Sequence, residues 1–295
     1  MKKLNVFIVM FLVFAYGISA STSLQFLKLG ISARSCGMGE AFTAVANDAS
    51  AIYWNPAGII QSQKHQIIFN QAMLFSGVSY TNLGYSQRFG TDKAFGLAFS
   101  YLAAGTVEET TEGFKDGTGE SLSVNNLRVS LAYSQSFSKR VFLGGSFKFM
   151  SETLGDISGS GMAFDLGLLF IVNNHINLGM VLQNIGTGVS YPNLTEELPK
   201  NLKLGIAFRL IKWKDNKLIG SIDLIKTIDE DLRYNVGFEY LLKNMIFLRA
   251  GYKGNLDEEG ICAGLGVKLK MVQIDYSYSA MRYINDAHRF SLVLE

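Results

Sequence analysis

LQFLKLGISARSCGMGEAFTAVANDASAIYWNPAGII, residues 24–60, differs in composition from the sequence on either side of it. Small residues recur in this stretch at short intervals: Gly30, Ser32, Ala33, Gly37, Gly39, Ala41, Ala44, Ala46, Ala49 and Ala51. Small side chains are needed where a backbone packs in a confined space, and Gly37 and Gly39 relax the φ limits that oppose a tight reversal. The stretch therefore predicts a compact plug inside a larger structure.

Local signals suggest how this plug folds. The composition of residues 40–45 favours one or two helical turns, and Asn47, Asp48 and Ser50 can supply caps or Asx turns. Pro56 disfavours the helical region for the residue before it, so the segment should end in a fixed turn. The plug motif comprises Gly30, Arg34, Gly37, Gly39, Asp48, Ser50, Trp54, Asn55, Pro56 and Gly58. Arg34 and Asp48 are its candidates for an internal ion pair.

The chain after the plug alternates between apolar and polar or small residues. In residues 202–210 one face carries Leu202, Leu204, Ile206, Phe208 and Leu210, and the other carries Lys203, Gly205, Ala207 and Arg209. Residues 233–240, 261–270 and 272–279 repeat this pattern. At about ten residues per strand plus turns, residues 65–294 accommodate roughly fourteen strands. We therefore expect an all-β membrane protein, an antiparallel transmembrane β-barrel with a short, partly helical N-terminal plug in its lumen.

Aromatic and charged residues separate the two faces of these strands. Aromatic residues lie near strand ends, as expected for girdles at the two membrane interfaces: Phe89, Tyr101, Tyr133, Phe137, Tyr240, Tyr252 and Tyr278. The charged residues on the opposite phase are Asp165, Arg209, Asp223, Arg233, Glu239, Arg249, Lys268 and Asp275. Facing lipid, a midplane arginine would cost roughly 2–4 kcal/mol, so we expect all eight to face the lumen. Side chains alone cannot fill a lumen of this width, and the plug is its natural filler.

Residues 1–20 have the features of a cleaved secretory signal peptide. Lys2 and Lys3 precede an apolar run, and Ile18-Ser19-Ala20 forms a small-residue cleavage site. The alternative, a membrane anchor, is disfavoured because the apolar run is shorter than the roughly 20 residues of a spanning helix. Removing the leader changes the balance from 27 cations and 25 anions to 25 of each. The neutral mature chain lacks the basic excess of a nucleic-acid-binding protein.

The run from Gly30 to Gly58 resembles the N-terminal signature of the PorV/PorQ family of bacterial outer-membrane proteins, a branch of the FadL-like barrels. The resemblance covers about thirty consecutive positions; the remaining chain agrees in length and strand pattern. It implies a fourteen-stranded outer-membrane barrel with the N-terminal segment folded inside. The expected division is residues 1–20 as signal peptide, 21–62 as plug and 63–295 as barrel. The chain ends in Leu294-Glu295, without the terminal aromatic residue often seen on such barrels.

Connection lengths suggest a direction for the barrel. With both termini on the periplasmic side, the inner turns are short and the outer connections are long, notably residues 103–124 and 185–201. The outer connections are also acidic. Two interpretations remain for Asp229, Glu230 and Asp231: solvated loop tips, or a rim that collects divalent cations near lipopolysaccharide or docks a basic partner.

The sequence offers no catalytic centre and no cofactor site. His65, His175 and His288 are scattered without a second ligand at metal spacing, so we assign no metal site and no catalytic residue. Cys36 and Cys262 are compatible with a disulfide or with two buried thiols. We therefore expect a protein that is not an enzyme.

Two functional classes remain. By family resemblance, the protein is a component of type IX-like protein secretion that receives exported substrates at its outer loops. Alternatively it is a FadL-like channel for hydrophobic small molecules, in which Gly96 and residues 103–105 permit a kink and side opening. The expected partners are outer-membrane lipid and lipopolysaccharide, secretion machinery or exported proteins, or a hydrophobic ligand, and not nucleic acid.

Overall fold

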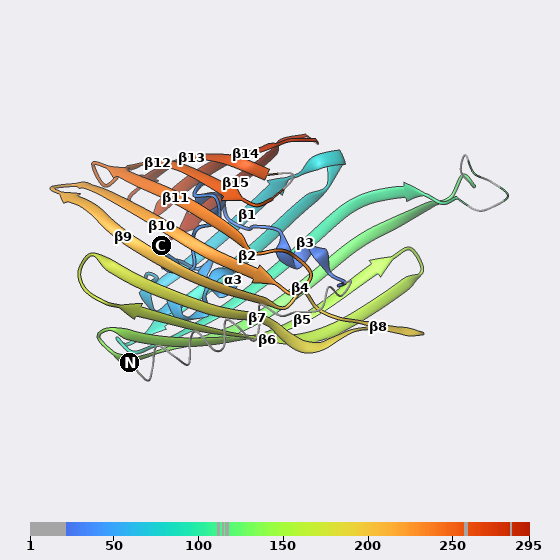
Figure 1. Ribbon diagram of the computed structural model, residues 1–295, viewed down its shortest axis with the longest axis horizontal. Coiled ribbons are helices and arrows are strands. Elements are labelled where there is room, and N and C mark those ends of the chain that lie inside the picture. The colour runs from blue at the N-terminus through green and yellow to red at the C-terminus, as the bar shows by residue number, and fades with distance from the viewer. Residues whose placement is uncertain (1–21, 111–112, 114, 116–117, 257–258, 284) are drawn as a thin grey trace.

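The computed structural model describes residues 22–295 except 111–112, 114, 116–117, 257–258 and 284 (Figure 1), so the predicted signal peptide lies outside the described residues. The strands are β1 (His65–Met73), β2 (Ser79–Phe89), β3 (Lys93–Glu108), β4 (Ser121–Ser138), β5 (Val141–Leu154), β6 (Ile157–Ile171), β7 (Ile176–Tyr191), β8 (Leu194–Glu196), β9 (Asn201–Trp213), β10 (Asn216–Thr227), β11 (Arg233–Leu242), β12 (Ile246–Gly254), β13 (Glu259–Leu269), β14 (Val272–Met281) and β15 (Ala287–Leu294). In the described part of the chain, no helix has the length and apolar character needed to cross a membrane.

The sheet closes on itself. Each long strand pairs antiparallel with its neighbours, β6 pairs with β7, β7 with β9, and β1 with β15. The short β8 pairs only with β7 among these strands. The result is a closed barrel of fourteen long strands, which confirms the predicted fold class.

The alternation separates lipid-facing from lumen-facing side chains. Outward residues such as Leu131 and Ile261 are 56% and 66% exposed, whereas inward Asn82 and Ser100 are buried. A barrel whose outer surface is apolar and whose inner surface is polar matches an environment of hydrocarbon outside and a polar lumen inside.

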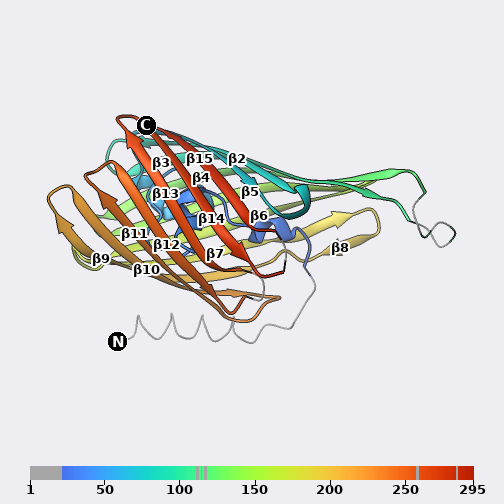
Figure 2. The same cartoon turned by 90° about the horizontal axis from the view of Figure 1, so that it is seen from above.

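Two outer connections differ from their predicted form. Residues 103–108 and 121–124 of the predicted loop at residues 103–124 are strand, because β3 and β4 continue as a hairpin that extends beyond the other loops in both views (Figure 1, Figure 2). Likewise β7 continues to Tyr191 and returns through β8 where a loop at residues 185–201 was expected. Above the membrane a hairpin needs no apolar face, so it loses the alternation used to recognise strands.

The plug occupies the lumen, and both views show the blue segment enclosed by strands (Figure 1, Figure 2). It contains η1 (Gln25–Lys28), α2 (Ala33–Gly37), α3 (Ala51–Trp54) and η2 (Pro56–Gln61); a further short turn, η3 (Phe75–Gly77), joins β1 to β2. The predicted one or two helical turns at residues 40–45 are reduced to a single turn, in which Val45 N and Ala46 N donate to Phe42 O, with no regular helix. The backbone N–H groups of Phe42 and Thr43 donate to Asp223 Oδ2 of β10, at 2.9 and 2.8 Å, and Glu40 has a positive φ.

The plug backbone packs directly against the barrel backbone. A Cβ added to Gly251 of β12 would lie 2.1 Å from Gly39 N, and one added to Gly144 of β5 would lie 2.4 Å from Ala57 N. A Cβ added to Gly179 would lie 2.5 Å from Thr43 O, and one added to Gly237 would lie 2.3 Å from Met38 O. Real Cβ contacts essentially never fall below 3.0 Å, so these four wall positions require glycine. Gly167, Gly205 and Gly264 also face the plug backbone.

The described chain enters the barrel at one end and leaves the plug at the other. We call the end with residues 74–78, 109–120, 192–200 and 228–232 the long-loop end, and the opposite one the short-turn end. Thr22 pairs with Glu197 at the long-loop end, whereas β15 finishes at the short-turn end, where Leu294 pairs with Ile67. The expectation that both termini share one side is therefore wrong for the described chain, because residues 22–64 traverse the lumen.

Replacing Gly144 by alanine should destabilise the protein, since the new methyl group overlaps the plug backbone. Overpacking of this kind costs about 1–3 kcal/mol. Gly145→Ala is the matched control, because this neighbouring glycine faces outward with its nearest atom at 3.5 Å. Denaturant unfolding in detergent, followed by heat-modifiable gel mobility, measures both. Equal stability of the two variants would contradict the proposed contact.

Candidate functional site

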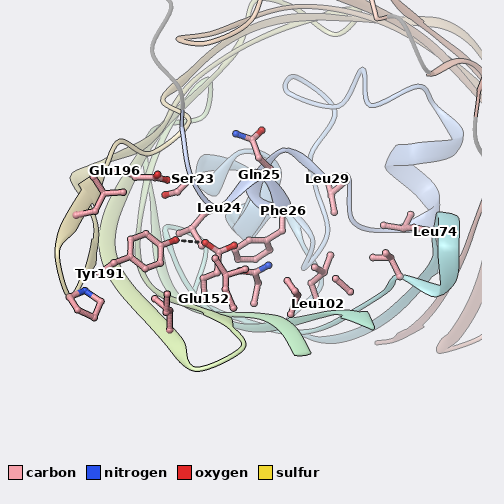
Figure 3. A pocket seen from close by; sticks show the side chains of 18 of the residues that line it. Ser23, Leu24, Gln25, Phe26, Leu29, Leu74, Leu102, Glu152, Tyr191 and Glu196 are labelled. Atoms are coloured by element: carbon pink, nitrogen blue, oxygen red, sulfur yellow. Dashed lines mark hydrogen bonds between the residues drawn. The ribbon is translucent and has the colours of Figure 1, made fainter. Parts of the chain in front are cut away.

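A cavity of about 770 Å³ opens at the long-loop end (Figure 3), and we call it the long-loop pocket. Its lining comes from the plug (Ser23, Leu24, Gln25, Phe26, Leu29), from the β1–β2 connection (Leu74, Phe75, Val78), from β3 to β6 (Leu102, Ala104, Val124, Asn126, Glu152, Leu154, Ile157) and from the β7–β8 hairpin (Tyr191, Pro192, Asn193, Leu194, Glu196). The lining is mostly aliphatic, and its volume lies within the range of ligand sites.

The polar groups of the pocket are acidic or neutral. Tyr191 donates a hydrogen bond from its hydroxyl to Glu152 Oε2, and Glu196 lines the same side. No lysine, arginine or histidine of the described chain lines this cavity. An apolar ligand could therefore enter, with two carboxylates at one edge.

The sequence prediction missed this pocket. The sequence does contain a sign of it, because the polarity of the inward-facing residues changes along the strands. Near the middle of the barrel these positions carry serine, asparagine and glycine, whereas at the outer ends of the strands they carry Leu102, Val124 and Leu154. An apolar inward face indicates that the lumen there is lined for something other than water.

The pocket floor is held by the plug and a polar ladder. Tyr53 donates a bifurcated hydrogen bond to the carbonyls of Leu27 and Leu29, both at 2.9 Å, and Phe26 packs edge-on against Tyr80. Below the floor, side-chain hydrogen bonds of 2.7–2.9 Å link Ser291, Asn70, Asn82, Ser100 and Arg128 across five adjacent strands. Ala33 N donates to Ser291 Oγ at 2.7 Å. The floor and the deeper plug are thus parts of one hydrogen-bonded structure.

Arg34 and Asp48 lie together, with Arg34 Nη1 2.8 Å from Asp48 Oδ2. The pair belongs to a longer chain of charges. Arg34 Nε contacts Glu239 at 2.8 Å, Glu239 contacts Arg249 at 2.7 Å, and Arg249 contacts Asp275 at 2.7 Å. This buried chain, the plug ion network, joins the plug to β11, β12 and β14. A second cavity of about 240 Å³ lies beside it on the short-turn side and is lined by both polar and apolar side chains.

The other predicted lumen charges occupy several environments. Asp165 contacts Lys148 at 2.6 Å, Asp223 binds the plug backbone, and Lys268 contacts Glu295 at 2.5 Å. Arg233 lies near the long-loop end, 3.2 Å from Glu230. Arg209, in contrast, is exposed at the short-turn rim, where it donates to Asn174 O, so it lies outside the filled lumen.

The structure adds buried cations that the sequence analysis did not select: Arg128, Lys148, Lys203, Lys253 and Arg289. Each lies on the inward phase of its strand, which was the available signal. Lys253 contacts Glu40 of the plug at 2.5 Å, and Lys203 lies over the Trp54 ring at 4.7 Å.

The remaining motif residues fix the turns of the plug. Trp54 Nε1 donates to Ile31 O at 3.1 Å, and Asn55 Nδ2 donates to Thr43 O and to Leu168 O of the wall. Asp48 Oδ1 accepts from Ser50 N, forming an Asx turn. Pro56 opens η2, Gly58 packs on Ala46, Gly30 lies against Cys36 and Glu40, and Gly37 rests on Gly264.

A latch holds the start of the plug at the long-loop end. Lys28 Nζ lies 2.6 Å from Asp229 and 2.9 Å from Glu230, Thr22 donates to Asp229, and Ser23 N donates to Glu197 O. Asp229 and Glu230 are therefore bound within the chain rather than presented to solvent. No group of three potential metal ligands occurs among the described residues. Neither result favours a cation-collecting rim at these two carboxylates.

Two further sequence interpretations are resolved by the geometry. Cys36 and Cys262 are both buried and form no disulfide. Strand β3 is paired on both sides at Gly96, whose added Cβ would meet Ile52 of the plug, and the wall has no side opening there. The irregularity of β3 lies further out, between Ala103 and Thr106.

Replacing Arg34 by alanine should lower the free energy of unfolding by about 3–5 kcal/mol, because it leaves Glu239 and Asp48 buried with fewer partners. Lys200→Ala is the control, since its pair with Glu197 is exposed and contributes at most about 1 kcal/mol. Unfolding in detergent and planar-bilayer conductance report the change. An Arg34→Ala protein with wild-type values for both would remove the structural role of the network.

The latch should depend on pH in a defined window. Burial alone would raise the pKa of Asp229, but its hydrogen bonds from Lys28 and Thr22 outweigh that effect and lower the pKa below 3.8. The stabilisation is therefore complete above the unfolded pKa and is lost as pH falls through the folded one. Asp229→Asn should lower the unfolding free energy by about 1–2 kcal/mol between pH 5 and 8. The difference in unfolding free energy between the variant and the wild type should shrink below about pH 4. A difference that stays constant down to about pH 2.5 would contradict the role of Asp229 in the latch.

Comparisons with known proteins agree with this architecture. A family model described as "Type IX secretion system protein PorV" matches residues 17–230. No curated protein sequence matches the chain. Among solved structures, the Pseudomonas putida toluene transporter TodX is 15% identical, with a TM-score of 0.65 over 90% of this chain and 96% of its own. The CymD monoaromatic hydrocarbon channel is 12% identical, with a TM-score of 0.63 over 93% and 97%.

A Pseudomonas aeruginosa FadL homologue is 12% identical, with a TM-score of 0.59 over 90% of this chain and 98% of its own. At these identities the likeness to solved structures shows the fold alone, whereas the family match covers most of the chain. The barrel and the family together indicate an outer-membrane protein. The chain belongs to the PorV family of type IX secretion system proteins.

Proposed function

We propose that this protein is a non-enzymatic secretion component that binds segments of exported proteins in the long-loop pocket while its plug keeps the lumen closed. The observation that carries the proposal is the contrast between the two halves of the lumen. The plug half is filled by backbone-to-backbone contacts, whereas the long-loop half is an open, mostly aliphatic cavity.

A moving plug is difficult to reconcile with these contacts. The plug is bonded to β10 through Asp223, to β11 through Glu239, to β12 through Lys253 and to β15 through Ser291. Separating a buried ion from its partner costs several kcal/mol, and the contacts would have to break together. A closed lumen therefore supports binding at the surface over passage through the barrel.

The position of the pocket suits a protein ligand. It lies at the long-loop end, beside the β3–β4 hairpin that extends past the rest of the barrel (Figure 1). Its wall includes β8, a strand of three residues that pairs with β7 on one side. A partner segment would meet both an apolar surface and a projecting hairpin.

Uptake of hydrophobic small molecules is the second candidate. Two of the similar structures are a toluene transporter and a monoaromatic hydrocarbon channel, and the pocket has the aliphatic lining that such a ligand needs. For uptake, however, a route past the plug or through the wall must open.

Photo-crosslinking distinguishes the two candidates. A benzophenone amino acid at Leu154, which lines the pocket, should form adducts with exported proteins in intact outer membranes. The matched control is Leu265, an exposed leucine on the lipid-facing side of β13. Adducts at Leu154 that contain only lipid or small molecules would favour uptake, and identical adduct patterns at both positions would reject the pocket as a protein-binding site.

A further inference from the structure

We infer that the long-loop pocket selects apolar segments that carry a basic residue and rejects those that carry a carboxylate. Glu152 and Glu196 are the specificity-determining residues. This inference rests on the proposed function, because it names the chemistry of the exported segment that the pocket receives.

The charges at the pocket edge are of one sign. Glu152 comes near the end of β5 and Glu196 ends β8, so two separate strands bring carboxylates to the same side of the cavity. Figure 3 shows Tyr191 on the same side as both, with Leu102 and Leu74 further across the cavity. A ligand that fills the apolar part can thus place one polar group at the acidic edge.

Among the described residues, no cation forms an ion pair with Glu152 or Glu196. Lys28 is bound to Asp229 and Glu230, and Lys200 to Glu197. Arg128 lies two residues below Asn126 but is 1% exposed, stacks over the Tyr53 ring at 4.7 Å and donates to Ser100. An entering carboxylate would meet two like charges in a partly desolvated site, whereas an ammonium or guanidinium would meet two acceptors.

The pocket lining also contains a neutral hydrogen-bond acceptor that has no donor. Asn126 is 5% exposed and lines the pocket, and its Oδ1 accepts no hydrogen bond from the described chain. A buried acceptor without a donor is unfavourable, and a ligand N–H would relieve it. Peptide segments supply such N–H groups along their backbone, and a basic side chain supplies more; hydrocarbons and carboxylates supply none.

The test uses the full-length mature protein in nanodiscs and short valine–threonine peptides that differ only in a central lysine, glutamine or glutamate. Fluorescence anisotropy should show the lysine peptide binding about tenfold tighter than the glutamate peptide, as expected for a charge-assisted hydrogen bond in a partly buried site. The Glu152→Gln/Glu196→Gln variant should bring the two affinities within about twofold, since glutamine keeps the shape and an acceptor.

The control variant is Glu108→Gln/Glu120→Gln, which removes two carboxylates from the β3–β4 hairpin at the same end but outside the pocket. It should retain the lysine preference. Peptides that bind without regard to charge would overturn the inference and leave the proposed function standing. If no peptide binds, the proposed function fails. The charge selectivity of the pocket is then tested by comparing the binding of dodecyltrimethylammonium with that of dodecanoate, and equal binding of the two would overturn the inferred selectivity.

Discussion

The structure depends on a plug backbone that lies directly against the backbone of its barrel. Fourteen strands enclose a lumen that wall side chains cannot fill. Here a short segment fills it, and it fits only because the wall carries glycine where Met38, Gly39, Thr43 and Ala57 pass. The same constraint accounts for the small residues of the plug itself. The close packing therefore depends on small residues both in the plug and in the barrel wall, and the composition of each is explained by its contact with the other.

Such close packing removes water from charged groups, so their partners must be supplied across the boundary between plug and wall. Glu239 contacts both Arg34 of the plug and Arg249 of β12, and Asp223 accepts hydrogen bonds from the plug N–H groups of Phe42 and Thr43. A buried ion is tolerated only with good geometry and additional hydrogen bonds. The network therefore specifies where the plug sits more than it adds to stability, in the way that buried polar groups can fix register.

Sequence reasoning identified the features that depend on local pattern. The period-two alternation gave the barrel, and the small-residue composition of residues 24–60 gave the plug. It overestimated helix at residues 40–45, where Glu40 has a positive φ and a single turn closes on Phe42 O, and it could not show that Asp223 of β10 accepts the Phe42 and Thr43 N–H groups. It also missed the pocket, since that cavity exists only where the ends of β3 to β8 converge on Phe26. Charge partners such as Arg34 and Glu239 likewise follow from closure of the barrel, which no local pattern specifies.

Because the plug fills the lumen, the surface available for binding lies at the long-loop end of the barrel and not along its interior. In a barrel with an empty centre, a ligand meets polar walls along its whole path. Here the plug covers the glycine-lined part of the wall and leaves a mostly aliphatic cavity of about 770 Å³ at the long-loop end and a smaller one of about 240 Å³ on the short-turn side. The latch between Lys28 and Asp229 holds η1 in place as one wall of the long-loop pocket. The plug is thus both the closure of the lumen and a component of the pocket, so a change that loosens the plug would also be expected to alter the site where a partner binds.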